Sequence, residues 1–292
     1  MNLELDFPAA LLVGAALAVS GAVLQSVLRN PLAEPYLLGS VGGAALFAAL
    51  AVNAGLVTLG LWVRPLASFI GSSVSLSLVF LVGLLAARAR ARNGADPALR
   101  SSGSTIVLAG FAVGGLMGSL DMLVLSYSTP ADFAALSKWL YGSFAAIDGR
   151  MLALAAVVAA AAWFVLSREV RAFNLLELGR DEAECLGVNA RRVTVVALAA
   201  VSLLTAVSVA LAGAVGFVGL VVPHFVRRLA GPRLERVLPL SALAGGLFLV
   251  FAEVLVRTLP GEIPVGVLCA ILGAPFFLFL LASRQSGEGR DV

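Results

Sequence analysis

Residues 193–222 form a run of about 30 residues without a single charged side chain. A membrane-spanning helix needs only about 20 apolar residues, so this run is too long for one untilted crossing. Gly213, Gly216 and Gly219 interrupt its second half, where they favour a break in the helix. We therefore predict a crossing near 193–212, followed by a short helix that returns to the same side of the membrane.

Most of the remaining chain has the same apolar character. Its mean hydropathy is +1.02, and charged residues make up only 13% of the sequence, well below the share in soluble domains. The predicted fold class is all-α, a polytopic transmembrane helix bundle with about nine crossings. We expect residues 1–292 to form a single transmembrane domain with a polar tail at 284–292. The other expected spans lie near 8–28, 37–57, 65–87, 104–127, 150–167, 237–258 and 264–283.

The basic residues predict the orientation, because cytoplasmic loops collect Lys and Arg. If 193–222 runs out and back, the basic clusters at 88–100, 168–192 and 227–236 all fall on one side. We therefore expect a multi-pass protein of the cytoplasmic membrane with an external N-terminus. Arginines that flank spans contact anionic lipid, so the net charge of +3 does not indicate nucleic-acid binding. The basic residues on the other side are Arg64, Lys138, Arg150 and Arg257.

Two carboxylates, Asp121 and Glu253, lie well inside predicted spans, where an ionisable group is a functional candidate. Glu253 precedes Arg257 by four residues, so the two side chains share a helix face and can pair. One interpretation is an ion-coupled secondary transporter that uses Asp121 and Glu253. Another is a purely structural membrane subunit.

Sequence motifs for catalysis are absent. The chain has no G-x-x-x-x-G-K-[ST] motif, so it is not itself a P-loop ATPase, and it has no H-E-x-x-H or G-x-S-x-G motif. Cys185 and Cys269 have no spacing typical of a metal site. We predict a transport subunit with no catalytic or metal-binding residues.

Two blocks of sequence carry a family resemblance. The first runs from Gly14 to Gln25 and continues through Arg29-Asn30-Pro31-Leu32-Ala33-Glu34-Pro35. The second comprises 208–231, 262–266 and 273–277. Over residues 10–283 the chain resembles the permease subunits of type II ABC importers for vitamin B12, haem and iron-siderophores, the FecCD-like family. The resemblance implies import of a metal chelate and does not choose among iron-siderophore, haem and cobalamin.

The resemblance also implies partners. Two permease copies, as a homodimer or a heterodimer, would line a central pathway in the lipid bilayer. Two separate ABC ATPase subunits would bind on the cytoplasmic side, and an extracytoplasmic substrate-binding protein would dock outside. ATP and Mg would be bound by the ATPase subunits, and no cofactor is expected on this chain.

The resemblance implies roles for individual residues. The segment 223–236 would couple to the ATPases through Pro223, His224, Arg227, Arg228, Gly231 and Arg233. A cytoplasmic gate would contain Asn30, Leu32, Ser128 and Thr129, although the predicted topology puts Ser128 and Thr129 near the outer surface. Arg257 and Glu262 would contribute to docking of the binding protein. The stretch Leu3-Glu4-Leu5-Asp6 departs from the family, which carries Arg-x-Pro-Arg at that place.

Overall fold

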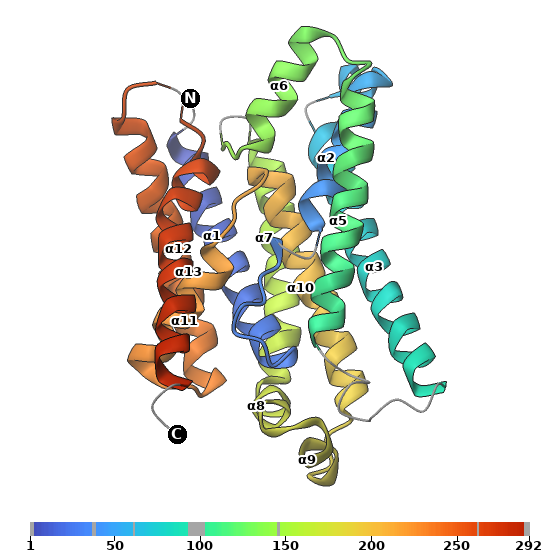
Figure 1. The fold of residues 1–292 in the computed structure, drawn as a ribbon. Helices are drawn as coiled ribbons and strands as arrows, with labels where there is room; N and C mark the ends of the chain where they lie inside the picture. The colour runs from blue at the N-terminus through green and yellow to red at the C-terminus, as the bar shows by residue number, and fades with distance from the viewer. Residues whose placement is uncertain are drawn as a thin grey trace.

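The computed structural model describes residues 3–36, 39–60, 62–92, 103–144, 147–261 and 263–288. Within these ranges the secondary structure is helical, without a strand, which confirms the predicted all-α class (Figure 1). In chain order the helices are α1 (Leu3–Val27), α2 (Ser40–Asn53), η2 (Leu56–Leu59), α3 (Val63–Arg92), α5 (Gly103–Leu125), α6 (Pro130–Leu140), α7 (Gly149–Arg168), α8 (Val170–Leu178), α9 (Arg180–Cys185), α10 (Ala190–Ala212), α11 (Val218–Ala230), α12 (Leu234–Thr258) and α13 (Val265–Glu288).

Six of these helices are long and apolar enough to cross a membrane, namely α1, α3, α5, α7, α10 and α12. Shorter apolar helices cover Ser40–Asn53 and Val265–Phe277. The chain is therefore a multi-pass membrane protein, as predicted. Helix α13 continues to Glu288, so the first residues of the predicted polar tail are helical. Residues 289–292 of that tail lie outside the described residues.

The long uncharged run folds as a helix, a turn and a second helix. Helix α10 ends at Ala212, residues 213–217 form the turn, and α11 begins at Val218. The turn uses positive φ angles of 70° at Gly213 and 68° at Phe217. Figure 1 shows α11 descending toward the end of the bundle from which α10 rises. The predicted return helix is confirmed.

The bundle has two distinct ends (Figure 1). Helix α6 and the N-terminus lie at one end, and α8 and α9 lie at the other; we call them the α6 end and the α8 end. At the α6 end, the Arg64 guanidinium lies 5.6 Å from the ring centre of Trp139 in α6. The basic segments 168–192 and 227–236 lie together at the α8 end, which the positive-inside bias therefore assigns to the cytoplasm.

Helix α1 lies in the centre of the bundle and packs against α10, α11 and α12. Glycines allow its backbone to touch two of these neighbours. A Cβ atom added to Gly21 would lie 1.8 Å from the carbonyl oxygen of Gly219 in α11, and one added to Gly14 would lie 2.1 Å from that of Gly245 in α12. Membrane helices gain stability from such close approach, because lipid is as apolar as their side chains.

Three short helices were not predicted from the sequence. Helix α6 begins in a regular way: Thr129 is its N-cap and accepts a hydrogen bond from the backbone N–H of Asp132, and Pro130 is its first residue. Helices α8 and α9 follow α7 and lie beyond the ends of the longer helices (Figure 1). They form much of the surface at the α8 end.

Candidate functional site

The predicted gate residues Asn30 and Leu32 lie in a tight turn where α1 ends. The backbone N–H of Arg29 bonds to the carbonyl of Ser26, and that of Asn30 bonds to the carbonyl of Gln25. This pattern, with Arg29 at a φ of 49°, is a Schellman motif, in which most proteins place glycine. The Asn30 side-chain oxygen then accepts a hydrogen bond of 3.0 Å from the backbone N–H of Leu32. The helix therefore stops before Pro31, and Asn30 shapes the loop that follows.

Residues 30–36, which we call the gate loop, are held against the first turn of α11. The carboxylate of Glu34 is buried and accepts a hydrogen bond from the backbone N–H of Phe217. Burial in this loop raises the pKa of Glu34 to about 7. Next to it, Pro35 packs so closely on Gly219 that an added Cβ there would lie 3.0 Å from the proline ring. The sequence predicted no role for Glu34, because its partner Phe217 is 183 residues later in the chain.

The predicted coupling segment 223–236 divides into inward-facing and exposed residues. Pro223 is buried within α11, and the His224 ring lies edge-on to Phe276 with a centroid separation of 6.0 Å. Arg227 points into the bundle and donates hydrogen bonds to the Ala22 carbonyl and to side chains of α1. Of the predicted coupling residues, Arg228 and Arg233 are exposed, and the neighbouring Phe225 and Leu229 are exposed as well. Gly231 ends α11 with a φ of +85°.

Helix α8 lies against the exposed part of this segment. The Asn174 amide donates hydrogen bonds of 2.8 and 2.9 Å to the two carboxylate oxygens of Glu235. Its carbonyl oxygen accepts one of 3.1 Å from the backbone N–H of Leu234, the first residue of α12. The sequence 168–192 was identified as a basic cytoplasmic segment, but it has no long apolar run that would have predicted these helices.

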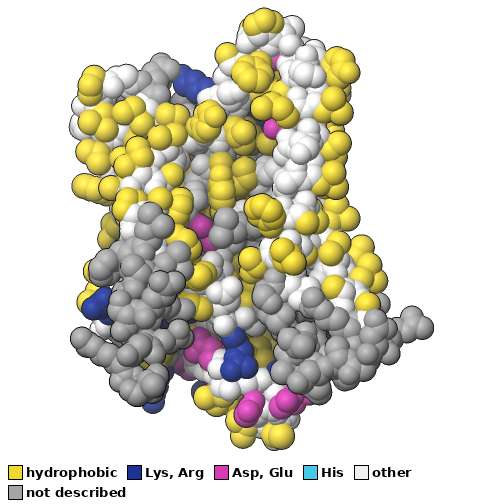
Figure 2. Space-filling view, viewed as in Figure 1, with side chains coloured by type: hydrophobic (Ala, Val, Ile, Leu, Met, Phe, Trp, Pro, Cys, Tyr) yellow, Lys and Arg dark blue, Asp and Glu magenta, His cyan; other side chains and the backbone are white. Residues whose placement is uncertain are grey.

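An open pocket of about 520 Å³ lies between α8 and the turn from α11 to α12. Leu178 and Leu186, at the C-terminal ends of α8 and α9, are 62% and 61% exposed. Figure 2 shows hydrophobic and charged side chains side by side at this end of the molecule. The pocket is lined by Asn174, Glu177, Pro232, Arg233, Glu235 and Arg236.

Ser128 and Thr129 lie at the opposite end of the bundle from Asn30 and Leu32. The Ser128 hydroxyl accepts a hydrogen bond of 2.7 Å from the Asn53 amide, and Thr129 caps α6. This position agrees with the topology predicted from the basic residues and disagrees with the placement implied by the resemblance. One gate at the α8 end therefore does not contain all four residues.

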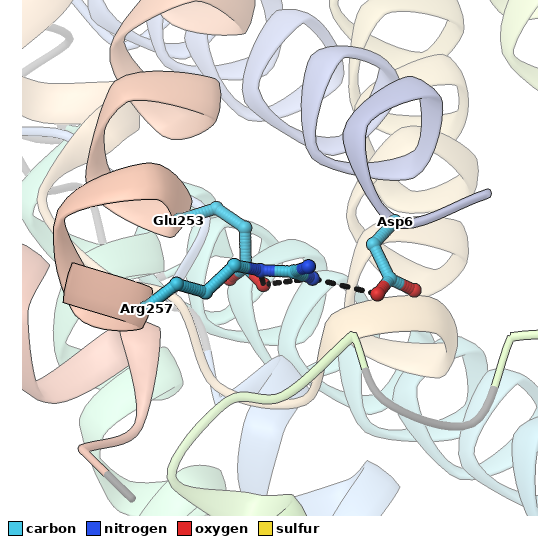
Figure 3. Close-up of polar contacts among 3 residues, drawn as sticks. All are labelled: Asp6, Glu253 and Arg257. Carbon is cyan, nitrogen blue, oxygen red and sulfur yellow. Dashed lines mark hydrogen bonds and ion pairs between the residues drawn. The ribbon is translucent and has the colours of Figure 1, made fainter. Parts of the chain in front are cut away.

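Near the α6 end, three charged residues form a cluster (Figure 3). Arg257 donates a hydrogen bond of 2.6 Å to Asp6 of α1 and one of 2.8 Å to Glu253, one turn earlier in α12. The predicted pairing of Glu253 with Arg257 is confirmed, and Asp6 is an additional partner. Both carboxylates are buried, and the guanidinium also lies over the ring of Phe7.

The cluster contains Arg257, one of the two residues predicted to dock the binding protein. The guanidinium of Arg257 is held between two carboxylates, so it is not a free positive charge on the surface. Glu262 lies outside the described residues. Asp121, the other intramembrane carboxylate, is buried on α5, a different helix from this cluster.

The architecture defines a class of protein: a membrane-embedded helix bundle with a short-helix surface at the cytoplasmic end, characteristic of transport subunits. The FecCD transport family matches residues 7–283 of the chain. A cobalamin import system permease protein BtuC from Halobacterium salinarum is 38% identical over 274 residues, which cover 94% of this chain and 70% of that protein. A vitamin B12 import system permease protein BtuC from Yersinia pseudotuberculosis is 36% identical over 276 residues, covering 94% and 78%.

Solved structures agree with this assignment. A structure described as a metal-chelate type ABC transporter in an inward-facing conformation has a TM-score of 0.82 and 30% sequence identity, and the match covers 96% of this chain and 86% of that one. PsaBC from Streptococcus pneumoniae, at 16% identity and a TM-score of 0.60, shares the fold. The chain belongs to the FecCD transport family and is a permease subunit of the BtuC type, not an enzyme.

Proposed function

We propose that this chain forms, with a second permease copy, the membrane pathway of an ATP-driven importer for cobalamin or a related metal chelate. Two ABC ATPase subunits bind at the α8 end and carry ATP and Mg, and an extracytoplasmic binding protein delivers the cargo at the α6 end. The cytoplasmic membrane is the expected location. The names of the relatives support cobalamin as the first cargo to test.

The observation that carries the proposal is the composite surface at the α8 end. Leu178 and Leu186 are exposed on the two helices beside a pocket lined by charged residues, and an apolar surface rimmed by polar residues is of the kind that protein partners cover. Asn174 of α8 is hydrogen-bonded to Leu234 and Glu235 at the start of α12. We therefore extend the proposed coupling site from 223–236 to α8 and α9. Arg233 lines the pocket together with α8, and Arg228 is exposed.

The proposed mechanism is alternating access. When ATP draws the two ATPase subunits together, they displace the surface that they contact, and the two permease copies change which side of the pathway is open. A ligand shifts such an equilibrium only through different contacts with the two states. The α8 end supplies contacts of this kind, and the gate loop with Asn30 and Leu32 is the element that we expect to open and close.

The ion-coupled alternative needs Asp121 and Glu253 to bind a proton or cation. Glu253 already pairs with Arg257 at 2.7 Å, so its charge is largely neutralised within the protein. Asp121 alone would then have to carry the coupled ion. This pairing favours the ATP-driven importer.

The test is co-expression of the chain with the ATPase subunit encoded beside it, followed by purification in detergent. We expect the two proteins to co-purify with vanadate-sensitive ATPase activity. The variant Leu178→Glu/Leu186→Glu should lose both, because it places charge in the apolar part of the contact. The control Arg150→Glu reverses a charge at the α6 end and should keep both. Failure of the unaltered chain to recruit the ATPase would contradict the proposal.

A further inference from the structure

A hydrogen-bonded chain connects α8 with α1 and α11 beneath the proposed coupling surface. Glu177 of α8 accepts a hydrogen bond of 2.5 Å from the hydroxyl of Ser26 in α1. That hydroxyl in turn accepts a hydrogen bond of 3.2 Å from the guanidinium of Arg227 in α11. Ser26 is 1% exposed, so the link runs through the interior.

The link from Glu177 through Ser26 to Arg227 joins two opposite charges. Arg227 is a cation in a partly buried position, and burying a charge is costly unless an opposite charge or several hydrogen bonds offset the lost hydration. The negative charge of Glu177 acts favourably on Arg227 across the Ser26 hydroxyl. Hydrogen bonds that involve an ionised group are about twice as strong as neutral ones. Glu177 therefore both accepts a hydrogen bond from Ser26 and stabilises the positive charge of Arg227.

The link continues to the gate loop. Arg227 also donates a hydrogen bond to the side-chain oxygen of Gln25, whose amide nitrogen donates one of 3.1 Å to the carbonyl of Gly219. Gly219 is in the first turn of α11, where Phe217 and Gly219 hold Glu34 and Pro35 of the gate loop. A displacement of α8 is thus connected to the gate loop through packed and hydrogen-bonded groups.

We infer that Glu177 is a positioning residue that transmits movement of α8 to the gate loop, through Ser26 and Arg227. The inference rests on the proposed function, because α8 moves only if an ATPase subunit displaces it. Helix α8 then makes two separate sets of contacts. Asn174 is hydrogen-bonded to the start of α12, and Glu177 is linked to α1 and α11 through Ser26 and Arg227.

The experiment follows the gate loop in the purified complex of the permease with its ATPase. The parent carries Leu32→Cys as a reporter, with Cys185→Ser and Cys269→Ala to remove the native thiols. The measurement is the rate at which a maleimide labels the reporter with ATP and vanadate, compared with the rate without nucleotide. In the parent we expect the two rates to differ by at least about fivefold, the lower end of coupling between distant sites.

Glu177→Gln keeps the size of the side chain and an oxygen for Ser26 but removes the charge, and Ser26→Ala removes the middle of the link. Each should reduce the nucleotide response to less than about twofold. In Ser26→Ala, whose side chain is buried on α1 away from the coupling surface, the ATPase should still co-purify and hydrolyse ATP. The double variant should be no worse than either single one, because both break the same link. The control Glu169→Gln, which removes a carboxylate paired with the mostly exposed Arg192, should respond as the parent does.

A full nucleotide response in Glu177→Gln and Ser26→Ala would overturn the inference and leave the proposed function intact. A parent that binds and hydrolyses ATP but shows no change at Leu32→Cys would also overturn it, because the gate loop would then be independent of α8. A parent that recruits no ATPase would instead remove the proposed function, and the inference with it.

Discussion

At the scale of single residues, the buried charges are stabilised in different ways at different places in the bundle. Arg257 is paired with two carboxylates from different helices. Burial raises the pKa of Glu34, and the hydrogen bond from the backbone N–H of Phe217 offsets only part of that rise. Each arrangement leads to a measurable consequence.

Replacing Arg257 with glutamine should destabilise the protein strongly. Asp6 and Glu253 would remain buried without their cation, and breaking a buried ion pair from one side typically costs about 3–5 kcal/mol. The measurement is the thermal unfolding midpoint in detergent micelles. The triple variant Asp6→Asn/Glu253→Gln/Arg257→Gln, which removes all three charges, should recover most of the loss. An unchanged midpoint in Arg257→Gln would show that the cluster contributes little.

Glu34 should make the stability depend on pH. Its pKa is about 7 in the folded protein and 4.5 when unfolded, so the folded state binds the proton more tightly. The stabilisation is present below pH 4.5 and is lost as the pH rises to about 7. Relative to Glu34→Gln, the parent should lose about 3 kcal/mol of unfolding free energy across this window. Unfolding curves at a series of pH values measure the difference, and parallel pH profiles would contradict the assignment.

At the scale of helices, α1 connects the parts that carry function. It contacts α12 through glycines, holds α11 through Gln25 and Ser26, and ends in the gate loop. The short helices α8 and α11 both pack against this central helix, and α8 also forms part of the surface at the α8 end. A change in their packing on α1 should therefore affect both stability and gating.

Gly21→Ala tests the close contact of α1 with α11. The new methyl group would lie 1.8 Å from the Gly219 carbonyl oxygen, so the helices would have to move apart. Overpacking of this kind typically costs about 1–3 kcal/mol, which should lower the thermal midpoint in detergent. The matched control is Gly149→Ala at the start of α7, where the nearest atom would be 3.9 Å away. Equal midpoints for the two variants would mean that α1 and α11 do not pack as described.

The sequence predicted helices better than it predicted contacts between them. The return helix after Ala212 could be predicted because the uncharged run exceeds one bilayer thickness and contains glycines. The pairing of Glu253 with Arg257 was predictable from their spacing within one helix. The contacts of Asp6 with Arg257 and of Ser26 with Glu177 join residues 251 and 151 positions apart, and no local pattern marks them.

The composition of the coupling surface was also only partly predictable from the sequence. The motif around Pro223 and His224 drew attention to 223–236, yet the structure turns Pro223 and Arg227 inward. Helix α8 is short and amphipathic and α9 is short and mostly charged, so neither has the apolar length of a span, and neither carries a motif. Their place at the end of the bundle follows from how the long helices pack.

At the scale of the whole molecule, the two ends of the bundle have different characters. The α8 end carries basic segments, exposed leucines and a pocket, and it connects through the interior to the gate loop. The α6 end has a neutralised arginine and a capped surface helix. This asymmetry fits a subunit that receives energy on one side of the membrane and cargo on the other.

The most direct test of ATP-driven import is uptake into proteoliposomes that contain this permease, its ATPase and its binding protein. The cargoes are cyanocobalamin, haem and a ferric siderophore. We predict accumulation of one of them that requires ATP and the binding protein, is blocked by vanadate and persists when the proton gradient is dissipated. Uptake that follows the proton gradient without ATP, and is abolished by Asp121→Asn, would contradict the account and favour an ion-coupled transporter.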